Sequence, residues 1–277
     1  MPKPDLNQID HPCVWRGEEL FQRPDWLHQL DDGHREELAE GGEMPRLSEL
    51  LKGVAQGLEH GSGAAFVRGF PIDSVDEDAA KVLLLRFVGL LGTPVSQSAE
   101  GDLVFSVRDA GYADHDPRSR GPNTRNKLSF HSDRCDVIGF LCLKQAKAGG
   151  ENDLVSSAAI FNYLLANQPE HVAALSEPFY YKRHNVDTSN ALPYCRQPIF
   201  SSTDGYFACN LLRVLIDRAY ADPQLPDMSE AQRAALDAVE STASLPGMHA
   251  RIRQQPGDML FLNNWVTLHR RTCLLYT

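Results

Sequence analysis

The sequence has no excess of basic residues, and this narrows the partners that the protein can have. Its 27 Lys and Arg residues are outnumbered by 37 Asp and Glu residues, which gives a formal net charge of −10 at neutral pH. Phosphate backbones and anionic lipid surfaces repel a protein with such a charge. We therefore predict that the protein binds neither nucleic acid nor membrane.

Long hydrophobic runs and paired cysteines are also missing. No apolar stretch approaches the roughly 18 residues needed to cross a bilayer, and the first residues, MPKPDLNQIDHPC, contain no hydrophobic signal core. Most of the cysteines lie among apolar neighbours, which is typical of reduced, buried thiols rather than of a disulfide framework or a zinc site. These absences predict a cytoplasmic protein. The six cysteines include no C-x-x-C pair: Cys13, Cys135, Cys142, Cys195, Cys209 and Cys273.

The chain contains no internal repeat and no low-complexity linker. Residues 1–45, which are polar and rich in Asp, Glu, His and Pro, are predicted to form an N-terminal arm. Residues 46–277 are predicted to form a single domain. Leu and Val at helical spacing predict helices over 46–61, 74–92, 156–168 and 229–242. Ser74 with Glu77, and Ser229 with Gln232, match the capping box that begins a helix.

Short segments separated by Gly, Pro, Asn and Asp predict many strands in the same domain. So many short strands favour a mainly β fold, a barrel or jelly roll, with flanking helices outside. The predicted strands are 63–71, 103–108, 127–133, 137–144, 178–184, 198–201, 206–209, 250–254, 258–262 and 265–271.

The segment FHSD (130–133) places a histidine and a carboxylate two residues apart in one of these strands. Successive side chains in a strand point to opposite faces, so His131 and Asp133 share a face. An ordinary His/Asp pair on a solvent face would give the same pattern. The segment alone therefore leaves both interpretations open.

A second histidine lies far downstream, in PGDMLFLNNWVTLHRRT (256–272). The spacing predicts two strands joined by an Asn-Asn turn, with Thr267, His269 and Arg271 on one face of the second strand. An H-x-D pair with a distant histidine is the donor set of a facial triad, which holds Fe(II) on one side and leaves other coordination positions open. The pattern predicts a metal site.

Five stretches, in order, resemble the TauD/TfdA (taurine dioxygenase) family of Fe(II)/2-oxoglutarate-dependent oxygenases. The resemblance implies a double-stranded β-helix (a cupin-like jelly roll) and metal ligands at His131, Asp133 and His269. It implies Fe(II), 2-oxoglutarate as cosubstrate, and O2. It also implies a dioxygenase that hydroxylates or otherwise oxidises a C–H bond of a small-molecule substrate and releases succinate and CO2. The five stretches are AFVRGFP (65–71), LLGTPVSQ (90–97), FHSD (130–133), AGGENDLVSS (148–157) and PGDMLFLNNWVTLHRRT (256–272).

The 2-oxoglutarate site departs from the family pattern. Asn152 stands where the family usually has a threonine that helps to hold the far carboxylate; its amide can donate in that place, or Asn152 is a turn residue. The family's carboxylate-binding arginine, a dozen or more residues after the distal histidine, has no counterpart here. Arg271, on the face of His269, is the candidate substitute. Arg270 is predicted to point outward.

The residues CLLYT follow Thr272 directly and resemble the start of the family's final strand. Two strands joined without a turn residue suggest a loop omitted between Thr272 and Cys273, with the anchoring arginine inside it. If that arginine is truly absent, a non-catalytic metal-binding jelly-roll protein is the alternative. A 2-oxoglutarate-independent metalloenzyme on the same barrel is another.

Candidate substrate-binding residues lie at the end of the predicted strand 178–184. Arg183 and His184 are there, beside Lys182 and Tyr181, in a region that the family uses near its substrate. These residues suggest an anionic or amino-acid-like ligand, although each is also compatible with an ordinary surface position. A homo-oligomer is left open.

Overall fold

The computed structural model describes residues 7–73, 75–98, 100–108, 125–183 and 192–275. Its first sheet has the strand order β1-β2-β11-β3. The strands are β1 (Leu27–Gln29), β2 (Ala64–Arg68), β11 (Met259–Asn263) and β3 (Val137–Leu141). β1 comes from the region 1–45 that we predicted to be an arm, and it runs parallel to β2, whereas β11 is antiparallel to both of its neighbours.

The second sheet has the order β10-β5-β12, with both pairs antiparallel. Its strands are β10 (Ala250–Ile252), β5 (Asn152–Ser156) and β12 (Thr267–Arg271). On the free side of β12, the segment that ends at His131 forms an isolated bridge with His269. The region predicted as a strand over 127–133 is therefore an extended segment with one bridge, not a regular strand.

The pairing of β12 continues past its last residue. Thr272 donates its N–H to the carbonyl of Glu151 (2.9 Å), and β13 (Leu274–Leu275) pairs with β4 (Ala148–Gly149). The chain from β12 to β13 thus follows the chain from β5 back to β4 as one antiparallel ladder. No turn separates β12 from β13 in this part of the chain, and the omitted loop stays a prediction.

The two sheets enclose an apolar layer. Leu260 and Leu262 of β11 point into it, and Leu154 of β5 meets them from the second sheet. Met259 and Phe261, at alternate positions of β11, point to the other face of the first sheet, toward the helices. Because both faces of β11 are covered, all five of its residues are buried. The site described below lies at the edge of this layer.

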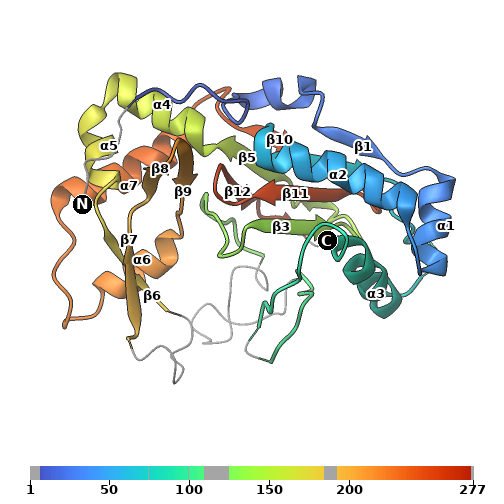
Figure 1. Ribbon diagram of the computed structural model, residues 1–277. Helices are drawn as coiled ribbons and strands as arrows, with labels where there is room; N and C mark the ends of the chain where they lie inside the picture. The colour runs from blue at the N-terminus through green and yellow to red at the C-terminus, as the bar shows by residue number, and fades with distance from the viewer. Residues whose placement is uncertain (1–6, 74, 99, 109–124, 184–191, 276–277) are drawn as a thin grey trace.

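Helices cover the outer faces of both sheets (Figure 1). Beside the first sheet lie α1 (Asp32–Glu40), α2 (Pro45–His60) and α3 (Glu77–Val88), and the short helix η1 (Gly17–Gln22) precedes β1. The apolar residues of α1, α2 and α3 form one cluster with the outward side chains of β2 and β11. The predicted helix over 74–92 is shorter than expected, and Asp76 caps it by accepting the N–H of Ala79 (2.8 Å).

A second group of elements packs against the second sheet. Ser156 caps α4, and α7 begins with the predicted Ser229/Gln232 capping box. No helix in the described part of the chain is long and apolar enough to cross a membrane. The predicted strand over 103–108 is not formed. The group comprises α4 (Ser157–Asn167), α5 (Pro169–Leu175), α6 (Arg213–Tyr220), α7 (Glu230–Ala243), and the hairpins β6 (Phe179–Lys182) with β7 (Tyr194–Gln197) and β8 (Phe200–Thr203) with β9 (Tyr206–Cys209).

Candidate metal centre

The structure brings the three predicted metal ligands together at the edge of the second sheet. His131 and His269 face each other across the isolated bridge, and their backbones exchange two hydrogen bonds of 3.0 and 2.9 Å. One ligand atom from each of His131, Asp133 and His269 lies within 4.8 Å of the other two. The Nε2 atom of His269 is 3.5 Å from Oδ2 of Asp133. Two imidazoles and a carboxylate therefore converge on one point.

The surroundings of His269 favour its neutral form, in which a ring nitrogen can bind a metal. Burial lowers the pKa of His269 well below its usual range, and the neighbouring His131 lowers it further. The Nδ1 atom of His131 lies 2.8 Å from the carbonyl oxygen of Ser129. A ring proton on Nδ1, donated to that carbonyl, would leave the lone pair of Nε2 for a metal, an arrangement typical of metal-binding histidines.

Asn264 holds the segment that carries the carboxylate. This residue is 2% exposed and lies in the turn between β11 and β12. Its Oδ1 accepts the backbone N–H of Asp133 (2.9 Å), and its Nδ2 donates to the carbonyl of Cys135 (3.1 Å). The backbone N–H of Asn264 donates to the carbonyl of Asp136 (2.9 Å). The sequence marked Asn264 only as a turn residue, so this contact was missed.

An aromatic side chain lies against His269 on the side of the first sheet. The ring of Phe140, from β3, lies edge-on to the His269 ring at 5.4 Å, and the two histidine rings are 4.4 Å apart. Phe140 packs against the apolar layer between the sheets. The candidate centre therefore has the polar donors of the second sheet on one side and an apolar wall on the other.

The two residues predicted to hold 2-oxoglutarate lie opposite each other in the β5–β12 ladder. Arg271 pairs with Asn152, one alternation beyond the pair of His269 with Leu154, so both side chains share the face of His269. Asn152 donates from Nδ2 to Oε1 of Gln254 (3.0 Å). Arg271 is 9% exposed and donates from Nη2 to the carbonyl of Asn126 (3.2 Å).

The predicted substrate residues have weaker support. Arg183 follows β6, where its Nε donates to the carbonyl of Tyr194 (3.4 Å), so its contacts are with the β6–β7 hairpin. His184 lies outside the described residues. The substrate role of both residues stays a prediction.

The environment of Arg270 differs from the expectation that it points outward into solvent. It lies on the opposite face from His269, as the alternation of the strand requires, but it is buried and bonded to Asp153 (2.9 Å) rather than directed into solvent. The helix α7 covers this face of the sheet, and the sequence pattern of β12 gives no signal of that cover.

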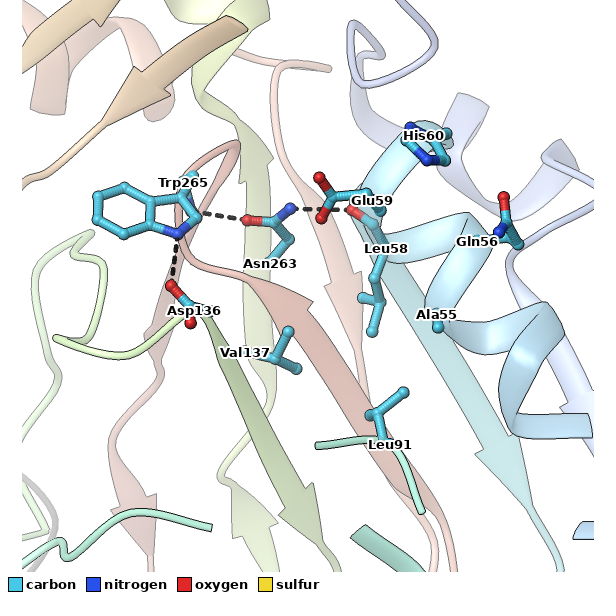
Figure 2. Close-up of a pocket in the computed structure, with 10 residues that line it drawn as sticks. All are labelled: Ala55, Gln56, Leu58, Glu59, His60, Leu91, Asp136, Val137, Asn263 and Trp265. Carbon is cyan, nitrogen blue, oxygen red and sulfur yellow. Dashed lines mark hydrogen bonds between the residues drawn. The ribbon is translucent and has the colours of Figure 1, made fainter. Parts of the chain in front are cut away.

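A hollow of about 570 Å³ lies where the end of α2 meets the first sheet (Figure 2). The end of α2, Leu91, Asp136 and the β11–β12 turn line it. Figure 2 shows Trp265 donating from its indole Nε1 to Asp136 (3.0 Å) and Asn263 donating to the carbonyl of Leu58 (2.9 Å). None of the three candidate ligands is among the residues that line this hollow, so we do not assign the substrate to it.

Comparison with known proteins identifies the family. The family model described as "Taurine catabolism dioxygenase TauD, TfdA family" matches residues 34–276. The chain belongs to the TauD/TfdA family. FR-33289 synthase of Streptomyces rubellomurinus (strain ATCC 31215) is 32% identical over 279 residues, which cover 93% of this chain and 82% of that protein. The taurine hydroxylase-like protein SAT17 of Stachybotrys chartarum (strain CBS 109288 / IBT 7711) is 29% identical over 244 residues, which cover 82% of this chain and 60% of that protein.

Solved structures of iron oxygenases share the fold of this TauD/TfdA protein. Asparagine oxygenase, in complex with Fe(II), 2S,3S-3-hydroxyasparagine and succinate, aligns with a TM-score of 0.62 at 18% identity, over 90% of this chain and 88% of that chain. The non-heme iron oxygenase OrfP, in complex with Fe and alpha-ketoglutaric acid, aligns with a TM-score of 0.58 at 17% identity, over 91% and 89% of the two chains. The predicted jelly-roll fold is confirmed.

Membership of the family makes the protein an Fe(II)/2-oxoglutarate-dependent dioxygenase, with Fe(II), 2-oxoglutarate and O2 as its cofactors. The site fits that metal. Its donors are two nitrogens and one carboxylate oxygen, the set that suits non-heme Fe(II). The buried Nδ1 of His269 has no hydrogen-bond partner within the described residues, and Nε2 faces Asp133. The donor set is common to the two alternatives, a non-catalytic metal-binding barrel and a 2-oxoglutarate-independent metalloenzyme, and it is the family membership that argues against them.

Proposed function

We propose that the protein binds Fe(II) through His131, Asp133 and His269 and oxidises a C–H bond of a small, amino-acid-like substrate. The convergence of the three ligand atoms within 4.8 Å carries this proposal. In this enzyme class, Fe(II) supplies the activation of O2 at the expense of 2-oxoglutarate, which leaves as succinate and CO2. The chain supplies the geometry, the charge and the exclusion of water.

Arg271 and Asn152 are proposed to hold the far carboxylate of 2-oxoglutarate. Arg271 is two residues beyond His269 on the same face of β12, which corresponds to about 6.5–7 Å along a strand. A five-carbon diacid that chelates the metal with its keto-acid end extends over a comparable length. A guanidinium at that distance can form paired, charge-assisted hydrogen bonds with the carboxylate, and the amide of Asn152 can add another.

The apolar side of the centre is proposed to keep bulk water away from the reacting atoms. Phe140 stands over His269, and Leu260 and Leu262 lie behind it in the layer between the sheets. Hydrogen bonds and charge interactions are stronger in such a dry environment than in water. The same wall leaves the exposed side, near the β6–β7 hairpin and Arg183, as the proposed approach for substrate.

Structural neighbours support an amino-acid-like substrate. One asparagine oxygenase structure contains 2S,3S-3-hydroxyasparagine, and OrfP structures contain hydroxylated forms of L-arginine. These proteins share the fold at 15–18% identity, so they suggest the class of molecule and not its identity.

A panel assay tests the proposal. The anaerobically loaded protein is mixed with O2, 2-oxoglutarate and each of the proteinogenic amino acids and their simple derivatives, and succinate release and hydroxylated product are measured by mass spectrometry. We expect one subgroup of the panel to yield product with stoichiometric succinate, only when Fe(II) is present. Product formation that is independent of Fe(II) or of 2-oxoglutarate would contradict the proposal.

Substituting Arg271 tests the cosubstrate site separately. Losing a hydrogen bond to a charged group costs about 1.5–3 kcal/mol, so Arg271→Met should raise the 2-oxoglutarate concentration for half-maximal rate by about 10–150-fold. Arg253→Met is the matched control, because Arg253 is partly exposed and pairs with Glu151 (3.4 Å). If both variants need the same 2-oxoglutarate concentration as the wild type, Arg271 is not the anchor.

A further inference from the structure

A second cluster of charges lies on the face of the second sheet that points away from the candidate centre. Asp153 of β5 stands between Arg251 of β10 and Arg270 of β12, each directly opposite it in the ladder. Arg251 donates to both oxygens of Asp153 (2.7 and 3.0 Å), and Arg270 donates from Nε (2.9 Å). The carboxylate is fully buried, and a buried charge is tolerated only with such partners. The three strands are thus tied together behind the site.

Arg270 extends this cluster to α7 and to the segment that carries His131. Its Nη1 lies 3.3 Å from Oε1 of Glu240 and 3.2 Å from Oγ of Ser244, both on the side of α7 that meets the sheet. Its guanidinium carbon stands 4.1 Å from the ring centroid of Phe130, a distance typical of stacked cation–π contacts. Arg270 follows His269 in sequence, and Phe130 precedes His131. The residue after one histidine therefore contacts the residue before the other.

Glu240 of α7 contacts both Arg270 and the segment that carries His131. While Oε1 accepts from Arg270, Oε2 accepts the backbone N–H of Phe130 (3.1 Å). A single carboxylate on α7 consequently holds the residue before one candidate ligand and the residue after another. All of these contacts lie on the side of the sheet away from the convergence of the three ligand atoms.

The segment of His131 needs such support. It joins β12 through the isolated bridge between His131 and His269 and a hydrogen bond from Leu128 to the carbonyl of Arg271 (3.0 Å), rather than through a regular ladder. The segment is also held at Ser132, whose N–H donates to the carbonyl of Leu211 (2.8 Å), and at Asp133, through Asn264. On the side that faces α7 it is held through Phe130, and this contact restricts a twist about β12 that would change the separation of the two imidazoles.

We propose that Glu240 and Arg270 are positioning residues that hold His131 and His269 at the separation required for metal binding. The inference rests on the proposed function, in that it takes these two histidines to be iron ligands. Neither residue touches the metal position; both act through the chain segments that carry the ligands. Groups that orient metal ligands in this way typically change metal affinity by 10–100-fold when they are removed.

Glu240→Ala is the test, because Glu240 is half-exposed at the protein surface and its loss leaves the buried Asp153 with both arginines. Fe(II) affinity is measured by anaerobic titration, the visible spectrum of the Co(II)-loaded protein reports the coordination geometry, and thermal unfolding of the metal-free protein reports the fold. We expect Glu240→Ala to bind Fe(II) about tenfold more weakly and to alter the Co(II) spectrum. Glu240→Gln, whose side-chain oxygen can still accept from Phe130, is expected to bind more tightly than Glu240→Ala.

Asp237→Ala is the matched control. Asp237 lies one turn earlier on α7 and pairs with Arg213 (2.8 Å), so its loss removes the same charge from the same helix without touching either ligand segment. We expect it to bind Fe(II) as the wild type does. The inference is overturned if Glu240→Ala binds as tightly as Asp237→Ala, or if both lose affinity equally. A wild type that binds no Fe(II) would instead overturn the metal site itself, and this inference with it.

Discussion

Replacing Asn264 with alanine should weaken metal binding by more than its effect on the fold can explain. The substitution removes the acceptor of the Asp133 N–H and the donor to the Cys135 carbonyl. At about 1 kcal/mol for each hydrogen bond, the fold loses about 2 kcal/mol, and the midpoint of thermal unfolding falls by about 4–8 °C for a chain of this size. With its backbone released, Asp133 no longer stays beside His269. We expect Fe(II) affinity to fall about tenfold.

The variant Asn263→Ala separates the loss of Fe(II) affinity from the loss of stability. Asn263 is the preceding residue, is 8% exposed, and also makes two side-chain hydrogen bonds, to the carbonyl of Leu58 and the N–H of Trp265 (both 2.9 Å). Its loss should lower the unfolding midpoint similarly and leave Fe(II) affinity unchanged, because it does not hold Asp133. Calorimetry gives the midpoints, and anaerobic titration of the two variants gives the affinities. Equal affinities in both variants would refute the reasoning.

Three further outcomes are expected. Asp133→Ala should bind Fe(II) weakly and form no product. Undiminished product in the mass-spectrometric assay would show that the Asp133 carboxylate is not a metal ligand. Asn152→Ala should raise the 2-oxoglutarate requirement about tenfold through the loss of one hydrogen bond to a charged group, and an unchanged requirement would make it a turn residue. Burial, with smaller contributions from Asp133 and Asp136, raises the pKa of Cys135 to about 11. This thiol should therefore stay protonated at pH 8 and react with iodoacetamide more slowly than the exposed Cys273, as peptide mapping would show.

Local patterns were enough to predict which side chains of the candidate site share a face. The alternation of side chains put His131 with Asp133, and His269 with Arg271, on shared faces, and the structure has them so. This works because the period of a strand is a local property of the backbone. It succeeded even where the segment around His131 forms only one bridge, since an extended backbone alternates with or without a full ladder.

The strand β5 could not be found in this way. It begins with Asn152 and Asp153, which follow Gly149, Gly150 and Glu151, and these residue types disfavour strands. Asp153 is stable in the middle of the sheet because Arg251 and Arg270 reach it from the neighbouring strands. Those partners are about 100 residues away or more, so no local pattern contains them.

Arg270 is a second residue whose surroundings the local sequence does not contain. The alternation of β12 gave its face correctly, but the environment of that face depends on α7, which the sequence of β12 does not contain. The contact of Glu240 with Phe130, 110 residues apart, is likewise a product of packing. The reverse error occurred over 103–108, where apolar residues suggested a strand that the structure does not form.

The iron content of the histidine variants tests the central claim most directly. The wild type, His131→Ala, His269→Ala and the control His60→Ala, an exposed residue at the end of α2, are dialysed anaerobically against Fe(II), and bound iron is measured per chain. We predict one Fe(II) per chain in the wild type and in His60→Ala. We predict none in the other two, because two remaining ligands do not hold a labile ion. Stoichiometric iron in either His131→Ala or His269→Ala would contradict the assignment of the metal centre.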